Sequence, residues 1–315
     1  MTPRANQLAF VFPGQGSQSL GMLAELAMGY PSVQRTFEQA SAGCGLDLWA
    51  ISQHGPKAEL DRTEITQPAL LAAAVAVWQI WVDSGRALPV RLAGHSLGEY
   101  SALVCAGALT LADAAALVRE RGRLMQAAVA PGQGAMAAVL GAKDEVIAQA
   151  CLDAAGDQVV AAANFNSPGQ TVISGTAAAV ARAITLLTER GVRKVIPLPV
   201  SVPSHCLLMR TAADALRERM LGLHWSLPQI PVIQNADARA NASISGIQDA
   251  LARQLYLPVR WIECVQALTQ VGITRIGECG PGEVLTGLCK RIDRSLDARA
   301  LATPAELATA ITDWS

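Results

Sequence analysis

Short apolar runs and longer runs with helical spacing alternate along residues 1–130. The apolar runs at 8–12 and 90–94 end at proline or glycine, which is typical of buried strands. Apolar residues that recur every three or four positions predict helices, which are expected at 20–28, 31–43, 69–83, 98–106 and 110–127. Thr110 can cap the last of these helices, and Pro68 fits the first turn of the third. Strands that alternate with helices predict a parallel sheet covered on both faces.

The pattern changes in the segment 131–199. Strands are predicted at 135–140, 159–163, 171–174 and 193–198, and helices at 143–154 and 176–190. This is the β-α-β-β-α-β order of a ferredoxin-like unit. We therefore expect a small domain over 131–199, inserted into a larger α/β domain formed by 1–130 and 200–315. The alternating pattern then resumes, with helices predicted at 207–221, 246–255, 261–271 and from 283, and strands at 231–234 and 273–277.

The composition indicates a large dry interior. Of the 315 residues, 51% are hydrophobic, 16% are charged and 4% are aromatic, so small aliphatic side chains are expected to form the core. The most apolar run, 69–82, is shorter than the roughly 20 residues of a membrane span. We interpret it as a buried core helix and expect no membrane association. The net charge of −1 argues against general nucleic-acid binding, which needs a concentrated positive surface.

The N-terminal segment and the cysteines both predict a cytoplasmic protein. No apolar stretch precedes the first strand, so no signal peptide is expected. The seven cysteines are scattered without a C-x-x-C pair, as is usual in a reducing compartment. Cys206 follows His205 directly, but neighbours in sequence rarely reach the geometry of a thiolate–imidazole pair.

The segment Gly94-His95-Ser96-Leu97-Gly98 is a G-x-S-x-G motif between a predicted strand and a predicted helix. In that context the serine is a candidate nucleophile on a sharp turn, where a Cβ at either glycine would clash. The N-terminus of the following helix would offer N–H groups to a developing oxyanion. The alternative is a glycine-bounded turn that carries an incidental serine.

A serine nucleophile needs a base, and the chain has four histidines. His205 is the best candidate, because prolines rigidify the segment before it and it follows the predicted small domain, where a cleft is expected. A capping or structural role is the alternative. The other three histidines fit less well: His95 should point away from the Ser96 hydroxyl, His54 lies in a predicted surface loop, and His224 lies in a loop-like segment.

No acidic residue between Ser96 and His205 has the loop context of a triad acid, which weakens a standard hydrolase interpretation. A backbone carbonyl or an amide is expected to hold the imidazole instead. Arg121 lies in the basic cluster 119–123 and is followed by Gly122, which would let a ligand or a backbone approach. Such a cluster is usually a solvated face. The alternative is that the guanidinium selects a substrate that carries a carboxylate.

Several motifs together resemble one family, the malonyl-CoA:acyl carrier protein transacylases of bacterial type II fatty acid synthesis. They occur in order along nearly the whole chain: Phe12-Pro13-Gly14-Gln15-Gly16-Ser17-Gln18, Gly94-His95-Ser96-Leu97-Gly98-Glu99-Tyr100, Asn164-Phe165-Asn166-Ser167-Pro168-Gly169-Gln170, Pro203-Ser204-His205 and Gly280-Pro281-Gly282. The resemblance implies a hydrolase-like α/β domain with a ferredoxin-like insert, in agreement with the pattern analysis.

The resemblance also implies a role for each matching position. Ser96 would be the acylated nucleophile and His205 its base. The backbone N–H groups of Gln15 and Leu97 would form the oxyanion hole. Arg121 would pair with the malonyl carboxylate, and the main-chain carbonyl of Gln254 would hold the imidazole, which explains the missing triad acid.

The implied reaction is ping-pong transfer of malonyl from malonyl-CoA to the phosphopantetheine thiol of acyl carrier protein. Malonyl-CoA and CoA are substrate and product, and no metal or other cofactor is implied. Two alternatives remain open from the residues: a serine esterase or thioesterase, and an acyltransferase subunit of another malonyl-handling complex such as malonate decarboxylase.

Overall fold

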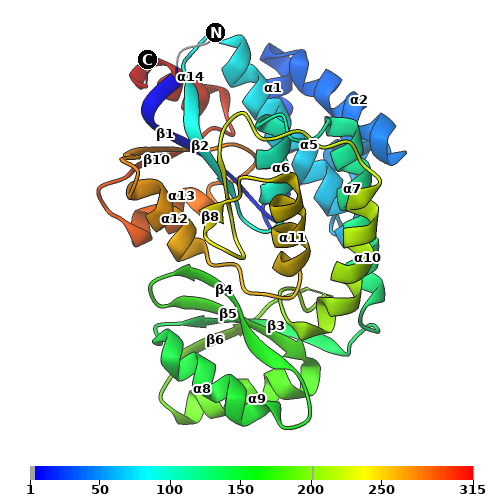
Figure 1. Cartoon of the computed structure of the whole chain (residues 1–315), viewed down its shortest axis with the longest axis vertical. Helices are drawn as coiled ribbons and strands as arrows, with labels where there is room; N and C mark the ends of the chain where they lie inside the picture. The colour runs from blue at the N-terminus through cyan, green and yellow to red at the C-terminus, as the bar shows by residue number, and fades with distance from the viewer. Residues whose placement is uncertain (1–3, 201, 315) are drawn as a thin grey trace.

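A six-stranded sheet forms the centre of the molecule in the computed structural model, which describes residues 4–200 and 202–314 (Figure 1). The strand order is β10-β9-β1-β2-β7-β8. All neighbours are parallel except β8, which is antiparallel to β7. The chain is thus a mixed α/β protein with a parallel-sheet core, as the sequence predicts. The strands are β1 (Arg4–Phe12), β2 (Leu88–Gly94), β7 (Val232–Gln234), β8 (Arg239–Ala240), β9 (Arg275–Glu278) and β10 (Asp297–Ala300).

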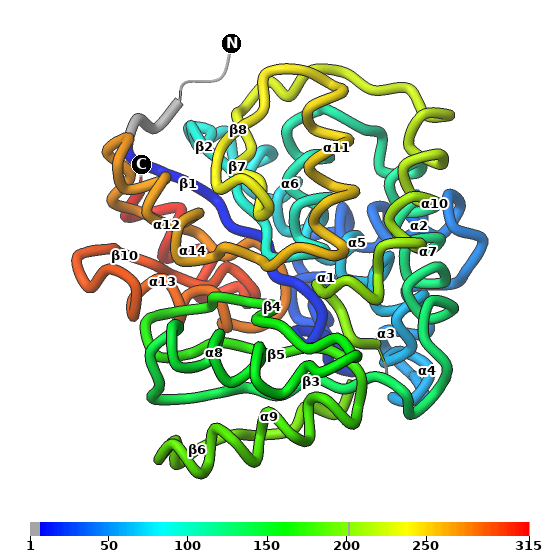
Figure 2. The backbone as a smooth tube through the Cα atoms, turned by 60° about the horizontal axis from the view of Figure 1, so that its bottom comes forward, coloured from blue at the N-terminus to red at the C-terminus, as the bar shows by residue number. Residues whose placement is uncertain are grey.

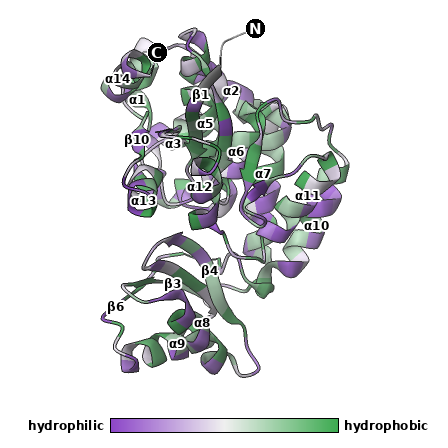
Figure 3. Cartoon of the chain, turned by 60° about the vertical axis from the view of Figure 1, so that its left-hand side comes forward, coloured by the Kyte–Doolittle hydropathy of each residue, from purple (hydrophilic) through white to green (hydrophobic). Residues whose placement is uncertain are grey.

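Helices cover both faces of this sheet, so alternate residues of β1 enter two different cores. Phe10 and Phe12 pack with α2, α5, α6 and α7, whereas Ala9 and Val11 pack with α12 and α13. Figure 3 shows hydrophobic residues concentrated on the central strands and on α5. The helices are α1 (Ala24–Gly29), α2 (Ser32–Cys44), α3 (Leu48–His54), α4 (Lys57–Leu60), α5 (Thr63–Asp83), α6 (Gly98–Cys105), α7 (Leu111–Ala127), the 3₁₀ turn η1 (Leu207–Met209), α10 (Arg210–Leu221), α11 (Ile244–Gln254), α12 (Trp261–Thr269), α13 (Val284–Ile292) and α14 (Pro304–Asp313).

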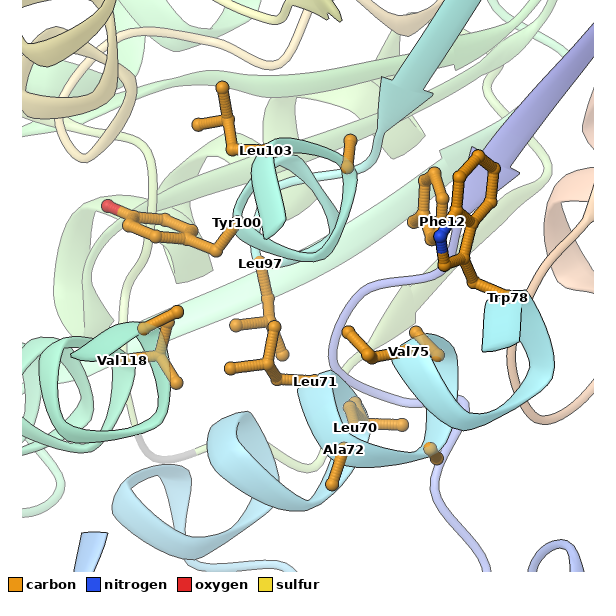
Figure 4. Close-up of a cluster of buried hydrophobic side chains, with 14 of the residues drawn as sticks. Phe12, Leu70, Leu71, Ala72, Val75, Trp78, Leu97, Tyr100, Leu103 and Val118 are labelled. Carbon is orange, nitrogen blue, oxygen red and sulfur yellow. The ribbon is translucent and has the colours of Figure 1, made fainter. Parts of the chain in front are cut away.

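The long apolar helix α5 lies inside the fold. By length and composition it could cross a bilayer, but 89% of its most apolar window is buried in the molecule. Figure 4 shows its side chains, such as Leu71 and Val75, turned toward apolar side chains of β1 and of the turn before α6, such as Phe12 and Leu97. The interpretation as a buried core helix is confirmed.

The start of α5 was predicted wrongly. The helix begins at Thr63 and contains Pro68 in its interior, instead of beginning at 69 with Pro68 in its first turn. An interior proline removes one helical hydrogen bond. Here it is tolerated because nearly every side chain from Thr63 to Trp81 is buried against neighbouring elements.

A second, four-stranded antiparallel sheet lies below the main sheet in Figure 1, with the order β4-β5-β3-β6. Its elements are β3 (Gly134–Leu140), α8 (Asp144–Ala155), β4 (Val160–Ser167), β5 (Gln170–Thr176), α9 (Ala177–Glu189) and β6 (Lys194–Pro197). Helices α8 and α9 bury one face of this sheet. Figure 2 shows β4 beside the chain that leads to α12. An isolated parallel bridge joins Asn164 to Val259 there.

Several elements were not predicted. Helices α3 and α4 and strands β8 and β10 have seven residues or fewer, too few to display a clear period. Helix α14 was missed although Leu307, Ala310 and Trp314 are buried at helical spacing and Thr303 and Glu306 form a capping box. His54 is the last residue of α3 and not part of a loop, although it is exposed. The predicted helix at 20–28 is shortened to α1, and the one at 207–221 begins with the 3₁₀ turn η1.

Candidate active site

Ser96 lies on a sharp turn between β2 and α6, with a positive φ of 52°. The two flanking glycines make this turn possible. A Cβ on Gly94 would lie 1.9 Å from the carbonyl carbon of Gly98, and a Cβ on Gly98 would lie 2.0 Å from the backbone oxygen of Phe12. The steric role predicted for both glycines is thus present.

His205 is in hydrogen-bond contact with Ser96, with 2.9 Å between Nε2 and Oγ. Its other ring nitrogen, Nδ1, lies 2.7 Å from the main-chain oxygen of Gln254, to which it can only donate. This bond leaves Nε2 free to accept the Ser96 proton. Burial lowers the pKa of His205 to about 3, so the imidazole is neutral at physiological pH.

The other candidate nucleophile and histidines lie outside this pair. The Sγ of Cys206 donates to the backbone oxygen of Pro203 at 3.2 Å, and burial raises the pKa of its thiol. His54 and His224 are exposed. His95 points away from the Ser96 hydroxyl, as expected, and its Nε2 bonds to Oδ1 of Asn166 on the smaller sheet at 2.8 Å.

Arg121, on α7, is only 1% exposed, and its guanidinium lies beside Ser96. Its Nη1 donates to Oε1 of Gln67 at 2.8 Å, and its Nη2 donates to Oγ of Ser96 at 3.2 Å. The solvated-face alternative is wrong for this residue. Gly122 admits a neighbouring helix and not a ligand, because a Cβ there would lie 2.6 Å from the Cα of Glu64 on α5.

Gln254 joins every member of this group, at the end of α11. Its main-chain oxygen accepts from His205, and its side-chain Oε1 accepts from Nη2 of Arg121 at 3.0 Å. Its Nε2 donates to the backbone oxygen of Ser96 at 2.9 Å and to the Glu99 carboxylate. Of these contacts, only the main-chain one is implied by the family resemblance.

Gln15 and Leu97 both line the cavity in front of Ser96. Within residues 4–200 and 202–314, no hydrogen bond uses the backbone N–H of either residue. Leu97 is the N-cap of α6, where helical N–H groups lack partners along the helix. The two N–H groups are therefore available to an oxyanion.

The cavity has a volume of about 220 Å³ and is lined by residues that follow strands of the main sheet and by residues of the smaller sheet. Its polar end contains Ser96, His205 and Arg121. The smaller sheet and the chain that follows it supply an apolar wall, formed by Met136, Val172, Leu198, Val200 and Val202. The cleft expected between the two parts of the chain is present.

Three buried polar residues were missed by the sequence analysis, namely Glu99, Asn235 and Gln67. Burial raises the pKa of the Glu99 carboxyl, although two hydrogen-bond donors and the charge of Arg121 pull it down. A signal for Glu99 was present, because it belongs to the motif 94–100 that carries the family resemblance. Nothing near Asn235 in the sequence indicates its position beside the turn.

The fold and the site define an acyl transferase. A nucleophile and a base meet in a cavity, free backbone N–H groups lie beside them, and a buried guanidinium adjoins them. In agreement, the family model of the acyl transferase domain matches residues 9–292.

Comparison with known proteins narrows this class. The chain is 53% identical to the malonyl CoA-acyl carrier protein transacylase of Salmonella typhimurium, over 97% of this chain and 99% of the relative. The crystal structure of the Xanthomonas oryzae pv. oryzae enzyme of the same name is 63% identical, covers 99% of each chain and has a TM-score of 0.98. A malonyl-transacylase in complex with a type II polyketide acyl carrier protein is 51% identical over 98% of this chain and 99% of that one, with a TM-score of 0.96. The chain belongs to the malonyl CoA-acyl carrier protein transacylase family.

Proposed function

We propose that the protein transfers the malonyl group of malonyl-CoA to the phosphopantetheine thiol of acyl carrier protein in fatty acid biosynthesis. The observation that carries this proposal is the buried Arg121 guanidinium 3.2 Å from the Ser96 hydroxyl. A fixed positive charge beside the nucleophile favours an acyl group that carries its own carboxylate.

In the first half-reaction, Oγ of Ser96 attacks the thioester carbonyl of malonyl-CoA while Nε2 of His205 takes its proton. The 2.9 Å contact between these atoms is within the reach that such a transfer needs. The carbon–sulfur bond then breaks, and the departing CoA sulfur receives the proton from His205. A malonyl ester of Ser96 remains.

In the second half-reaction, the phosphopantetheine thiol gives its proton to His205 and attacks this ester. The carbon–oxygen bond to Ser96 then breaks, His205 returns the proton to Oγ of Ser96, and the malonyl thioester of acyl carrier protein forms. The backbone N–H groups of Gln15 and Leu97 hold the oxyanion in both halves, each contributing roughly 3–4 kcal/mol to barrier lowering. One thioester replaces another at nearly equal energy, so we propose that neither a metal nor a redox cofactor takes part.

A hydrolytic esterase is the weaker interpretation. A standard triad would place a carboxylate on Nδ1 of His205, whereas that atom faces the main-chain oxygen of Gln254. A role in another malonyl-handling complex has no residue that favours it over the family's own reaction.

We also propose that the chain has the two domains expected from its sequence, 131–199 inserted between 1–130 and 200–315. The antiparallel order β4-β5-β3-β6 with two helices on one face supports a ferredoxin-like insert. The parallel sheet with its strand–turn–helix serine supports a hydrolase-like larger domain. Seven free cysteines support a cytoplasmic location.

The test is incubation with malonyl-CoA, followed by intact mass and peptide mapping, with and without holo-acyl carrier protein. The expected adduct is one malonyl group on Ser96. It should disappear when holo-acyl carrier protein is added, and it should not form in the Ser96→Ala variant. Release of free malonate at the same rate with and without carrier protein would overturn the transferase assignment.

A further inference from the structure

We propose that Glu99 is a positioning residue, which holds Gln254 and Asn235 so that His205 and Ser96 keep their reactive arrangement. This inference rests on the proposed function. Glu99 does not contact the reacting atoms itself; it acts through its two partners.

Glu99 lies in the first turn of α6, next to the nucleophile turn, and is fully buried. Its Oε1 accepts from the backbone N–H of Asn235 at 2.9 Å, and its Oε2 accepts from the side-chain Nε2 of Gln254. Asn235 follows β7 and Gln254 ends α11. The carboxylate therefore joins three segments that are far apart along the chain.

The direction of each hydrogen bond in this group is fixed by Arg121, because a guanidinium can only donate. The Oε1 of Gln254 must face Arg121, so its Nε2 must face Ser96 and Glu99. On the other side, a backbone N–H can only donate to Glu99. Glu99 therefore has to accept one hydrogen bond at each of its two oxygens.

The two partners hold the catalytic pair from opposite ends. Gln254 presents its main-chain oxygen to Nδ1 of His205 at 2.7 Å. Asn235 accepts from the backbone N–H of Ser96 at 2.7 Å and donates through Nδ2 to the backbone oxygen of Gly94, also at 2.7 Å. Thus one partner orients the base and the other clamps the turn that presents the nucleophile.

Glu99→Gln is the sharpest test, because it keeps the shape of the side chain and replaces one acceptor by a donor. The new NH₂ group must face either the N–H of Asn235 or the Nε2 of Gln254, and neither can turn away without losing its other bonds. A buried clash between donors will displace one partner. A displacement of about 1 Å near reacting groups costs on the order of 100-fold in rate.

The first readout is labelling of Ser96 by phenylmethylsulfonyl fluoride, which reports the reactivity of the serine–histidine pair without any malonyl chemistry. We expect Glu99→Gln to slow this labelling 10- to 100-fold. We also expect acylation by malonyl-CoA and by acetyl-CoA to slow by equal factors with little change in KM. A role through the Arg121 guanidinium would instead slow malonyl-CoA alone, and that result would overturn the proposal.

Glu278→Gln is the matched control. Glu278 is also a fully buried carboxylate with two backbone donors, the N–H groups of Leu285 at 3.1 Å and Thr286 at 2.7 Å. It has no bond to Gln254 or Asn235. We expect this variant to lose thermal stability while labelling of Ser96 by the sulfonyl fluoride changes less than threefold. If labelling slowed equally in both variants, Glu99 would contribute only to the stability of the fold, and the proposal would be overturned.

A double variant tests whether Glu99 acts through Gln254. Gln254→Ala breaks the same link at its other end, so Glu99→Gln added to it should slow labelling by less than twofold further. If Glu99→Gln does not fold, Gln254→Ala alone carries the test, and unchanged labelling there refutes the proposal. Failure of the proposed function looks different, because wild-type Ser96 would then react with the sulfonyl fluoride and yet form no malonyl adduct.

Discussion

The Nη2 atom of Arg121 lies 3.2 Å from the Oγ of Ser96, so the guanidinium contacts the nucleophile in the free enzyme. The same hydroxyl is 2.9 Å from Nε2 of His205. Arg121 stays in place through two further bonds, to Gln67 and to Gln254. The positive charge is therefore held beside the point of attack and does not have to be brought there by substrate binding.

Replacing Arg121 by alanine should reduce acylation by malonyl-CoA far more than acylation by acetyl-CoA. A hydrogen bond to a charged group contributes about 1.5–3 kcal/mol, which corresponds to a selective loss of roughly 10- to 100-fold in kcat/KM. The measurement is single-turnover acylation with both thioesters. Arg123→Ala is the control, because that side chain is on the same helix but 62% exposed. Equal losses for both substrates would show that Arg121 is structural.

The acylation rate should not fall at acidic pH in the way that protonation of an ordinary histidine would cause. Because burial lowers the pKa of His205 from 6.5 to about 3, its base form remains dominant when the pH falls through 6.5. We expect the single-turnover acylation rate to change less than about twofold between pH 7 and pH 5, with circular dichroism used to confirm folding at each pH. A rate that halves near pH 6.5 contradicts the assignment of a buried neutral base.

The stability of the protein should depend on pH through Glu278. Burial raises its pKa from 4.5 to about 7, so its stabilising contribution is complete below pH 4.5 and is lost as the pH rises through 7. Glu278→Gln lacks this titration. The variant's free energy of unfolding, relative to the wild type, should therefore increase between pH 5 and pH 8, by on the order of 3 kcal/mol at most.

Urea unfolding of both proteins at the two pH values measures this difference. Other titrating groups, including Glu99, are present in both proteins and cancel in the comparison. A difference that does not vary with pH is incompatible with the raised pKa.

Gly98→Ala should abolish acyl-enzyme formation and destabilise the protein. Its Cβ would lie 2.0 Å from the backbone oxygen of Phe12, which cannot move without shifting β1. Such overpacking costs on the order of 3 kcal/mol. Gly287→Ala is the control, because it lies in α13 with nothing within 4 Å of its Cβ position and should be neutral or slightly stabilising. Thermal unfolding and the mass of the malonyl adduct report both outcomes, and a fully acylated Gly98→Ala protein would disprove the steric argument.

The parts of this site that the sequence predicted are those encoded by local geometry. The glycines around Ser96 allow a sharp turn within five residues that a Cβ would block, so a motif is enough to identify the turn. The alternation of strands with helices likewise predicts the parallel sheet. Arg121 and Gln254 could be assigned only by resemblance to a family, because their approach to Ser96 depends on how α7 and α11 pack.

The parts that were missed depend on packing between distant segments. Asn235 contacts the nucleophile turn only because β7 lies beside β2 in the sheet. The start of α5 was predicted too late because proline usually marks the first turn of a helix. Here the burial of the surrounding side chains, which the sequence does not show, offsets the cost of an interior proline. Short elements such as α4 and β8 have too few residues to display a period.

The walls of the cavity come from separate hydrophobic cores. Ser96 and Arg121 are carried by elements that pack around the parallel sheet, whereas Met136 and Val172 belong to a small cluster on the second sheet. Substitutions in that small cluster therefore change the shape of the cavity without disturbing the packing that aligns the nucleophile and its base. Natural variation, or directed evolution, can thus alter which acyl chains fit while the chemistry of the transfer is inherited unchanged.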